Sequence, residues 1–459
     1  MTSRFDAIVI GTGQSGPPLA ERLAQAGQKV AVIERGRFGG TCVNTGCIPT
    51  KTLVASARAI HMARRGAEFG FRPKGAVRVD MKRVKARMDA IAGQSTRGVA
   101  AWMRGTDGIA VIKGHARFAG PKTVQVGKQE LVAERIFVDA GGRPAVPDMP
   151  GLGEVPYRVN STMLDVDFLP AHLVVIGGSY IGLEFAQMYR RFGAKVTVIE
   201  KGERLIARED PEVSAAVQKI LEAEGVAVRL KAECMAVTKR GKGVAVDLDC
   251  RGGARRVAGS HLLLAVGRVP NTDDLGLDRA GIATDRRGYI QVDDRLETSV
   301  KGVYALGDCN GRGAFTHTSY NDFEVVAANL LDGGDRKVTD RIPAYALYVD
   351  PPLGRAGMND AEARRSGRKV LVGRLAMRSV GRARERSETE GFLKILIDAD
   401  TRRILGTTML GIEADEVMQA VLGLMYADQP YDVIQRGMYI HPTVCEYLPT
   451  LVGDLKPLA

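Results

Sequence analysis

Two cysteines stand five positions apart in the segment GGTCVNTGCIPTK, residues 39–51, and a lysine ends the same segment. The thiolate is the reactive form of cysteine, and a helix N-terminus or a nearby lysine lowers the pKa of a thiol. Cys42, Cys47 and Lys51 therefore indicate a disulfide that takes up and gives away electrons.

The spacing of the two cysteines also constrains the backbone between them. On a regular helix, residues five apart point about 140° away from each other. A disulfide needs Cα atoms about 4.4–6.8 Å apart. We therefore expect an irregular segment here, with Asn44 and Gly46 tolerating the backbone angles that it needs.

A second reactive group stands near the C-terminal end of the chain, in HPTVCE, residues 441–446. Histidine titrates near neutral pH, so His441 can take a proton from a thiol and return it. Glu446 would orient the imidazole ring and stabilise its protonated form. Cys445 within the motif is either an additional thiol near the site or, as we favour, a small packing residue.

These side chains must be positioned by larger elements, and one such element occurs twice. Residues 9–36 align without a gap on residues 175–202, and each copy reads as a strand, a glycine turn, a helix, a strand and an acidic residue. This pattern is typical of dinucleotide-binding units of doubly wound α/β domains.

In the first unit, three glycines and one acidic residue have distinct predicted tasks. Gly11 makes the tight turn, Gly13 lets the backbone approach a pyrophosphate, and Gly16 lets the helix pack close to the strand. The N-terminus of that helix would face the phosphates with its free N–H groups. Glu34 would accept hydrogen bonds from ribose hydroxyls.

In the second unit, the same places are taken by Gly177, Gly182 and Glu200, while Ser179 replaces the middle glycine. Glu200 favours a free 2′-hydroxyl and therefore NADH. Lys201 and Arg204 would accommodate a 2′-phosphate, so NADPH also stays open.

Taken together, these motifs resemble those of the flavoprotein disulfide reductases over essentially the whole chain. Within that family the chain is most similar to the mercuric-reductase-like and reactive-chlorine-resistance flavoproteins and to dihydrolipoamide dehydrogenase. The resemblance implies FAD in the first unit, NADH or NADPH in the second, and a C-terminal domain that forms a homodimer.

The resemblance also implies roles for the side chains around the disulfide. Cys42 is the interchange thiol that meets the substrate, and Cys47 is the thiol on the flavin side, in charge-transfer contact with oxidised flavin. Lys51 lies near flavin N5 and is paired with Glu184. Tyr180 is an aromatic gate over the nicotinamide pocket.

Further cofactor contacts follow from the same resemblance. Asp308 ends the late flavin motif TSVKGVYALGD, residues 298–308, and would bind the ribityl chain. His317 lies near the flavin. Gly141 belongs to the connecting motif DAGGRPAVP, and Gly267 to VGRVPN at the end of the second unit. His441 and Glu446 would act on Cys42 of the partner subunit.

We expect an α/β fold with two doubly wound nucleotide-binding domains and a C-terminal α+β dimerisation domain. Residues 1–146 and 272–336 would form the FAD domain, residues 147–271 the NAD(P) domain, and residues 337–459 the dimerisation domain. A helical stretch is predicted over residues 51–104, and the strand at residues 303–306 would return to the first sheet.

Composition narrows the possible partners of this 459-residue chain. Its net charge of +12 would suit a polyanion, but the basic residues are spread along the chain and aromatic residues make up only 5%. We therefore expect no nucleic acid partner. No run approaches the roughly 20 apolar residues that span a bilayer, and the start lacks a secretory signal. We expect a cytoplasmic protein without a membrane partner.

No resident metal site is expected either. Four histidines show no metal-ligand spacing, namely His61, His115, His172 and His261.

The function predicted from these features is an FAD-dependent NAD(P)H oxidoreductase that cycles a Cys42–Cys47 disulfide to reduce a small disulfide, an oxidant or a metal ion. One alternative is dihydrolipoamide dehydrogenase. Another is a non-catalytic redox sensor or complex subunit, which the His441–Glu446 pair weighs against because a binding module needs no base.

Overall fold

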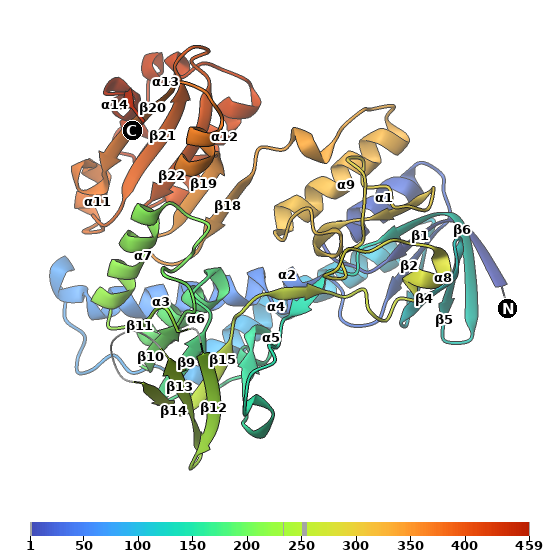
Figure 1. Cartoon of the computed structure of the whole chain (residues 1–459), viewed down its shortest axis with the longest axis horizontal. Coiled ribbons are helices and arrows are strands. Elements are labelled where there is room, and N and C mark those ends of the chain that lie inside the picture. The colour runs from blue at the N-terminus through green and yellow to red at the C-terminus, as the bar shows by residue number, and fades with distance from the viewer. Residues whose placement is uncertain (1, 233, 250–254, 459) are drawn as a thin grey trace.

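The structure, a computed structural model, describes residues 2–232, 234–249 and 255–458. Within these residues the chain is built around three main sheets with helices packed on them, which Figure 1 shows as three bodies joined by long helices and extended segments. The predicted α/β class, with two doubly wound units and a separate C-terminal body, is confirmed.

The first sheet has seven strands in the order β3-β2-β1-β6-β5-β4, with β17 beside β6. Its parallel strands are β1 (Thr2–Ile10), β2 (Val30–Glu34), β3 (Ile109–Lys113), β6 (Gln129–Val138) and β17 (Val303–Ala305). The antiparallel edge is formed by β4 (Ala116–Gly120) and β5 (Thr123–Val126). The strand predicted at residues 303–306 therefore does return to this sheet.

The second sheet has five parallel strands in the order β11-β10-β9-β15-β8. They are β8 (Arg158–Val159), β9 (His172–Ile176), β10 (Lys195–Ile199), β11 (Ala227–Arg229) and β15 (His261–Leu264). This order repeats that of β3-β2-β1-β6, so the repeat in the sequence is also a repeat in topology. An antiparallel sheet packs beside it, made of β12 (Cys234–Arg240), β13 (Gly243–Asp249) and β14 (Arg256–Gly259).

A short antiparallel ribbon links these two bodies, with β7 (Gly142–Pro144) paired to β16 (Arg268–Pro270). Gly141 and Gly267 directly precede its two strands. The backbone N–H of Asn271 donates to Gly141 O at 3.0 Å, and that of Ala145 donates to Gly267 O at 2.9 Å. The two glycines thus lie at opposite ends of the ribbon.

The third sheet, near the C-terminus, is antiparallel throughout and has the order β18-β19-β22-β21-β20-β23. Its strands are β18 (Ala344–Leu347), β19 (Leu353–Gly357), β20 (Val370–Ala376), β21 (Phe392–Asp398), β22 (Ile404–Leu410) and β23 (Lys456–Pro457). Helix α12 (Ala414–Tyr426) packs on β19 and β22. This body also contains helices α10 (Asp360–Arg365), α11 (Gly381–Glu385), α13 (Asp432–Arg436) and α14 (Leu448–Gly453).

The helical stretch predicted over residues 51–104 consists of two helices, α3 (Cys47–Arg64) and α4 (Met81–Gly105), with a 3₁₀ turn at Gly66–Phe69 and a loop between them. Gly70, Pro73 and Gly75 break the helix, because glycine and proline are the poorest helix formers. Asp80 restarts it by accepting a hydrogen bond from Arg83 N at 3.1 Å as an N-cap.

The parallel strands are buried on both faces, which is why they read as unbroken apolar runs. Ala7, Ile8 and Val9 of β1 are fully buried, and so are Leu173, Val174 and Val175 of β9. Helix α1 (Gly16–Gln25) covers one side of the first sheet and contacts α9 (Thr316–Leu331). Helix α6 (Tyr180–Phe192) covers the second sheet and packs against α3.

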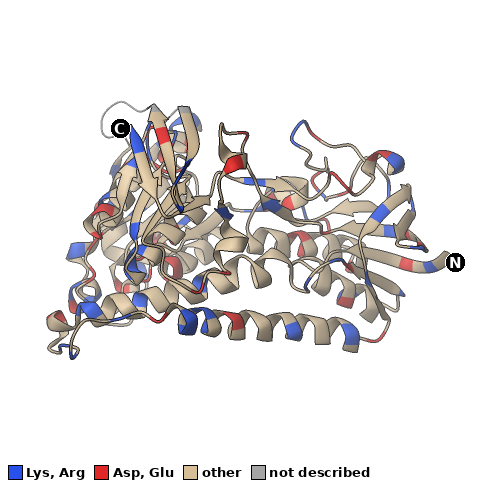
Figure 2. Ribbon diagram, turned by 90° about the horizontal axis from the view of Figure 1, so that it is seen from below, with Lys and Arg blue, Asp and Glu red and all other residues tan. Residues whose placement is uncertain are grey.

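Charged residues are distributed over the whole molecule. Figure 2 shows Lys and Arg interleaved with Asp and Glu along the ribbon. Among the residues that the structure describes, no helix combines the length and the apolar composition that a membrane span requires.

Candidate active site

The two cysteines lie on either side of a break between two helices. Cys42 belongs to α2 (Gly40–Asn44), and Cys47 is the first residue of α3. The break falls at Gly46, which has φ −132° and ψ −115°. A Cβ atom there would lie 2.9 Å from Thr41 O. The segment is therefore irregular, as the spacing predicts, but Asn44 is helical and instead donates through Nδ2 to Phe38 O and Gly40 O.

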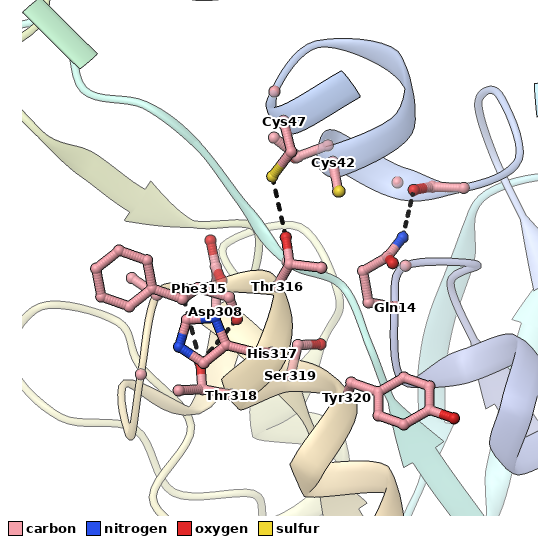
Figure 3. A pocket seen from close by; sticks show the side chains of 18 of the residues that line it. Gln14, Cys42, Cys47, Asp308, Phe315, Thr316, His317, Thr318, Ser319 and Tyr320 are labelled. Carbon is pink, nitrogen blue, oxygen red and sulfur yellow. Dashed lines mark hydrogen bonds between the residues drawn. The ribbon is translucent and has the colours of Figure 1, made fainter. Parts of the chain in front are cut away.

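Both thiols are free in this structure and are hydrogen-bonded to each other. The Sγ atom of Cys47 also lies 3.0 Å from Thr316 Oγ1, and Figure 3 shows both sulfurs facing the same hollow. The hydrogen bond from Cys42, the contact with Thr316 and the charge of Lys51 lower the pKa of Cys47 to about 6. The hydrogen bond to Cys47 and burial raise the pKa of Cys42. Cys47 is therefore the thiolate of the pair.

Lys51 and Glu184 form an ion pair between α3 and α6. Lys51 Nζ lies 2.6 Å from Glu184 Oε2, and the Glu184 side chain is 6% exposed. The backbone N–H of Tyr348 donates to Glu184 Oε1 at 3.0 Å, and Lys51 Nζ lies 4.6 Å from the centre of the Tyr348 ring. Tyr348 thus positions both members of the pair.

The first glycine turn is shaped to admit a phosphate group. Gly11 has φ +105°, and a Cβ atom there would lie 2.2 Å from Asp139 O. At Gly13 a Cβ would lie 2.7 Å from Asp139 Oδ2, and at Gly16 it would lie 2.5 Å from Gly11 O. All three positions require glycine. Pro17 and Pro18 open α1, as the free N–H groups of a first turn allow.

Glu34 closes this turn from the end of β2. Its Oε2 accepts from Thr12 N at 3.1 Å and from Thr12 Oγ1 at 2.5 Å, while Oε1 accepts from Gly36 N at 2.6 Å. Asp308 forms an ion pair with Arg268 at 3.3 Å, and burial raises the pKa of its carboxyl group.

One continuous cavity of about 2370 Å³ joins these residues to the thiols. It is lined by Gly11, Gly13, Glu34, Cys42, Cys47, Lys51, Gly141, Tyr180, Glu184, Asp308 and His317. Ordinary ligand pockets measure about 300–1,000 Å³, so this cavity has room for an extended dinucleotide. A glycine turn without space for side chains, a helix N-terminus and an acidic residue at the strand end fit FAD.

The second glycine turn repeats this geometry outside the cavity lining. A Cβ atom at Gly177 would lie 2.3 Å from Ala265 O, and one at Gly182 would lie 2.0 Å from Gly177 O. Glu200 accepts from Gly178 N and from Gly202 N, both at 2.7 Å. These contacts fit a second dinucleotide. Gly267 lies at the linking ribbon and does not line the cavity.

His317 lies in the cavity wall beside Thr316. Its Nε2 atom is 2.7 Å from Ala344 O, and its ring stacks on that of Phe315 at 5.4 Å. Burial lowers the pKa of His317. Burial thus favours the neutral imidazole, which one hydrogen bond and one stacked ring hold in place.

His441 and Glu446 lie together but away from the cavity. His441 Nδ1 is 2.8 Å from Glu446 Oε2, and the His441 side chain is 79% exposed. Neither residue lines the cavity that holds the thiols. Cys445 packs against the core of the third body, and burial raises the pKa of its thiol, in keeping with a packing role.

Several side chains of the site carry no recognisable signal in the sequence. Thr316 directly precedes His317 and was identifiable only from that neighbour. Tyr348, Tyr345 and Glu209 come from segments whose proximity depends on how the second and third bodies pack together. Asp139, the first residue of the connecting motif, meets the first glycine turn because β6 pairs with β1.

Two family models match the chain. Residues 5–322 match pyridine nucleotide-disulphide oxidoreductase, and residues 343–452 match the dimerisation domain of the same family. The chain belongs to this family of flavoprotein disulfide oxidoreductases, whose members use FAD and NAD(P)H. It is therefore an oxidoreductase, and its dimerisation domain supports a homodimer.

Particular relatives cover nearly the whole chain. The probable pyridine nucleotide-disulfide oxidoreductase RclA of Escherichia coli is 35% identical and covers 99% of this chain and 100% of its own length. Dihydrolipoyl dehydrogenase of Thermus scotoductus is 35% identical (99% and 96% covered), and mercuric reductase of Streptomyces lividans is 30% identical (99% and 98%). The solved Cu(II) complex of RclA from Escherichia coli, an HOCl-induced flavoprotein disulfide reductase, matches with a TM-score of 0.89 at 33% identity, over 98% of this chain and 99% of that one.

Proposed function

We propose that this enzyme oxidises NADH and delivers the electrons through the Cys42–Cys47 pair to a small disulfide, an oxidant or a metal ion. The observation that carries the proposal is the placement of both sulfurs on one cavity, with Cys47 held as a thiolate by Lys51, Thr316 and Cys42.

The two thiols have different tasks in this proposal. The glycine turn at Gly11, Gly13 and Gly16 would hold FAD, which would supply the two-electron chemistry between the reduced nicotinamide and the disulfide. The sulfur of Cys42 then attacks one sulfur of the acceptor disulfide and releases the first thiol. The Cys47 thiolate attacks the sulfur of Cys42 in the mixed disulfide, which releases the second thiol and restores the Cys42–Cys47 bond.

Proton transfer would come from the His441–Glu446 pair. The imidazole takes the proton of Cys42 and gives it to the departing thiol, while Glu446 stabilises the charged ring. Because His441 is exposed and lies outside the cavity of its own subunit, we propose that it acts on Cys42 of the other subunit. The dimer would therefore be the active form.

A metal ion is a second acceptor within the same chemistry. The relative RclA has been solved as a Cu(II) complex, and thiolates are good ligands for copper. Two Cu(II) ions would each take one electron from the reduced pair and leave as Cu(I). This acceptor would be a substrate at Cys42, since the described residues hold no cluster of three or more metal-ligating side chains.

NADH is favoured over NADPH by the second unit. Both carboxylate oxygens of Glu200 are engaged by backbone N–H groups, which fixes the charge at the strand end. Arg204 donates to Ala207 O at 3.1 Å, so one of the two cations suited to a 2′-phosphate is already engaged.

We propose the same domain boundaries that the sequence predicts. Residues 1–146 and 272–336 would bind FAD, residues 147–271 would bind the nicotinamide dinucleotide, and residues 337–459 would form the dimer interface. Support comes from β17, which joins the first sheet although β7 to β16 separate it from β6.

Steady-state turnover with NADH and NADPH tests the proposal, using lipoamide, glutathione disulfide, Cu(II) and Hg(II) as acceptors. We expect turnover with NADH that is lost in Cys42→Ser.

Dihydrolipoyl dehydrogenase is the second candidate, favoured by 35% identity to that enzyme and by the His441–Glu446 pair. This candidate function predicts that lipoamide is the best acceptor by far. The absence of turnover with every acceptor would instead favour a sensor or a complex subunit.

A further inference from the structure

The buried carboxylate of Glu209 accepts hydrogen bonds from three side chains next to the cavity. The hydroxyls of Tyr180 and Tyr345 both donate to its Oε1 at 2.8 Å, and Arg355 Nη1 lies 3.2 Å from its Oε2. The Glu209 side chain is 0% exposed and that of Arg355 is 3% exposed. A carboxylate this deeply buried depends on its donors, since an unpaired buried charge is strongly unfavourable.

Tyr180 and Tyr345 both line the cavity, and Tyr180 is the one that the second unit contributes. It is the first residue of α6, directly after the second glycine turn, and it lines the cavity together with Lys51 and Glu184. Its ring centre lies 6.3 Å from that of Phe315, the neighbour of the Thr316 that contacts Cys47. Given the proposed function, a nicotinamide ring held by the second unit reaches the cavity where the Tyr180 ring now lies.

The other partners of Glu209 are fixed in the third body. Tyr345 of β18 is the ladder partner of Arg355 of β19, and its ring stacks on Phe315 at 5.4 Å. Arg355 also donates to Thr408 Oγ1 at 2.8 Å and lies 3.4 Å from Asp210 Oδ2. Asp210 in turn is 2.8 Å from Lys394 Nζ. None of these four contacts involves Tyr180, so a movement of its ring would leave them intact.

We propose that Glu209, Tyr345 and Arg355 form a latch that holds Tyr180 closed over the nicotinamide entrance and stays satisfied when Tyr180 leaves. The inference rests on the proposed function. In the closed state Oε1 has two hydroxyl donors, and in the open state it keeps that of Tyr345. Tyr345 is thus a positioning residue that lowers the free energy of opening, whereas the Tyr180 hydroxyl raises it.

The two hydroxyls therefore have opposite effects on nicotinamide binding, although both bind the same oxygen. In Tyr180→Phe the closed state loses its hydrogen bond, so opening becomes easier and the Kd falls. In Tyr345→Phe the open state leaves Oε1 without a hydroxyl donor, so opening becomes harder and the Kd rises. A hydrogen bond to a charged group predicts changes of about fivefold or more in each direction.

The test is the Kd of NAD⁺ for the oxidised, FAD-loaded dimer, measured by titration calorimetry on the wild type and both variants. Tyr304→Phe is the matched control: it also removes a tyrosine hydroxyl bonded to a glutamate, Glu297, in the first body, and we expect an unchanged Kd. Glu209→Gln, a weaker acceptor with the same shape, should lower the Kd as Tyr180→Phe does.

Opposite shifts in Tyr180→Phe and Tyr345→Phe support the latch. Shifts in the same direction, or unchanged values in variants that keep the wild-type Tm, overturn it. A general loss of packing would weaken binding in both variants alike, so the sign separates the two explanations. Because NAD⁺ binding needs no acceptor, a wild type that binds NAD⁺ but reduces no acceptor would disprove the proposed function and leave the latch measurable.

Discussion

Lys51 Nζ lies 2.6 Å from Glu184 Oε2, so α3, which carries Cys47 at its first position, is tied to α6 of the second unit by a pair of residues 133 positions apart. The pair is partly buried and Tyr348 supports it from the third body. All three bodies therefore meet beside the thiols.

Replacement of Glu184 tests the importance of this pair. In Glu184→Gln the charge partner of Lys51 is lost, and we expect flavin reduction by NADH to slow about tenfold or more, since a hydrogen bond between charged groups is worth about 1.5–3 kcal/mol. Stopped-flow absorbance under anaerobic conditions measures this rate. Glu203→Gln, which removes an exposed partner of Lys231 at 3.1 Å, is the control and should react like the wild type.

The lowered pKa of Cys47 predicts that this thiol ionises at lower pH than an ordinary cysteine. In Cys42→Ser, Cys47 is a free thiol that has lost the hydrogen bond from the Cys42 thiol, the largest cause of its low pKa, but keeps Thr316 and Lys51. Its thiolate fraction, monitored by long-wavelength absorbance, should therefore rise with a midpoint above about 6 and below that of an ordinary thiol. Lys51→Met should move the midpoint upward, because the cation favours the charged form. A Cys47→Ser variant that kept this absorbance would contradict the assignment of the two thiols.

His441 is expected to act in the reduction of the acceptor disulfide and not in the reduction of flavin by NADH. His441→Ala should keep bound flavin and normal reduction by NADH but slow disulfide turnover about 100-fold or more, the usual contribution of a positioned base. Separate measurement of the two half-reactions shows which one is affected. His261→Ala, at a half-exposed histidine of β15, should change neither, and normal disulfide turnover in His441→Ala would remove the base assignment.

Asp139 lies at the first glycine turn, and the ionisation of its carboxyl group should make the free energy of unfolding depend on pH. Its Oδ2 accepts from Gly16 N at 2.9 Å, and burial raises the pKa of its carboxyl group well above the ordinary value, with Asp308, Glu34 and Asp322 adding to the effect. Because the unfolded chain loses this proton first, stability falls as the pH rises above the unfolded pKa of about 3.9. Asp139→Asn keeps the acceptor but cannot ionise.

The difference in Tm between Asp139→Asn and the wild type should therefore shift in favour of Asp139→Asn as the pH is raised from 4 towards 8. Both proteins are measured with FAD bound. Asp332→Asn, at an exposed partner of Arg22, should show no such growing advantage. A constant difference between Asp139→Asn and the wild type over this pH range would show that folding does not raise the pKa of Asp139.

Lys394 should contribute strongly to the stability of the third body. It is 2% exposed, and its Nζ lies 2.8 Å from Asp210 Oδ2, 2.8 Å from Glu212 Oε1 and 2.7 Å from Asp360 Oδ1. Lys394→Ala leaves these carboxylates without their shared cation and should cost about 3–5 kcal/mol of unfolding free energy, measured by urea denaturation. Lys369→Ala breaks an exposed pair with Asp400 at 3.9 Å and should cost less than about 1 kcal/mol.

The sequence alone determined the features that depend on neighbours along the chain. The two glycine turns, the acidic strand ends and the irregular segment between Cys42 and Cys47 each follow from spacing within one βα unit or one helical turn. The parallel order of both sheets follows from the repeat of that unit. The break between α3 and α4 was not predicted, although Gly70, Pro73 and Gly75 stand there.

Only the tertiary structure decided which distant side chains surround the thiols. Thr316 reaches Cys47 because α9 begins at the edge of the cavity, and the donors to Glu209 meet because α6, β18 and β19 converge there. These contacts join residues between 29 and 269 positions apart, and no local periodicity encodes them. They depend on how the sheets and helices pack together, since burial of a charge is tolerated only where that packing supplies its partners.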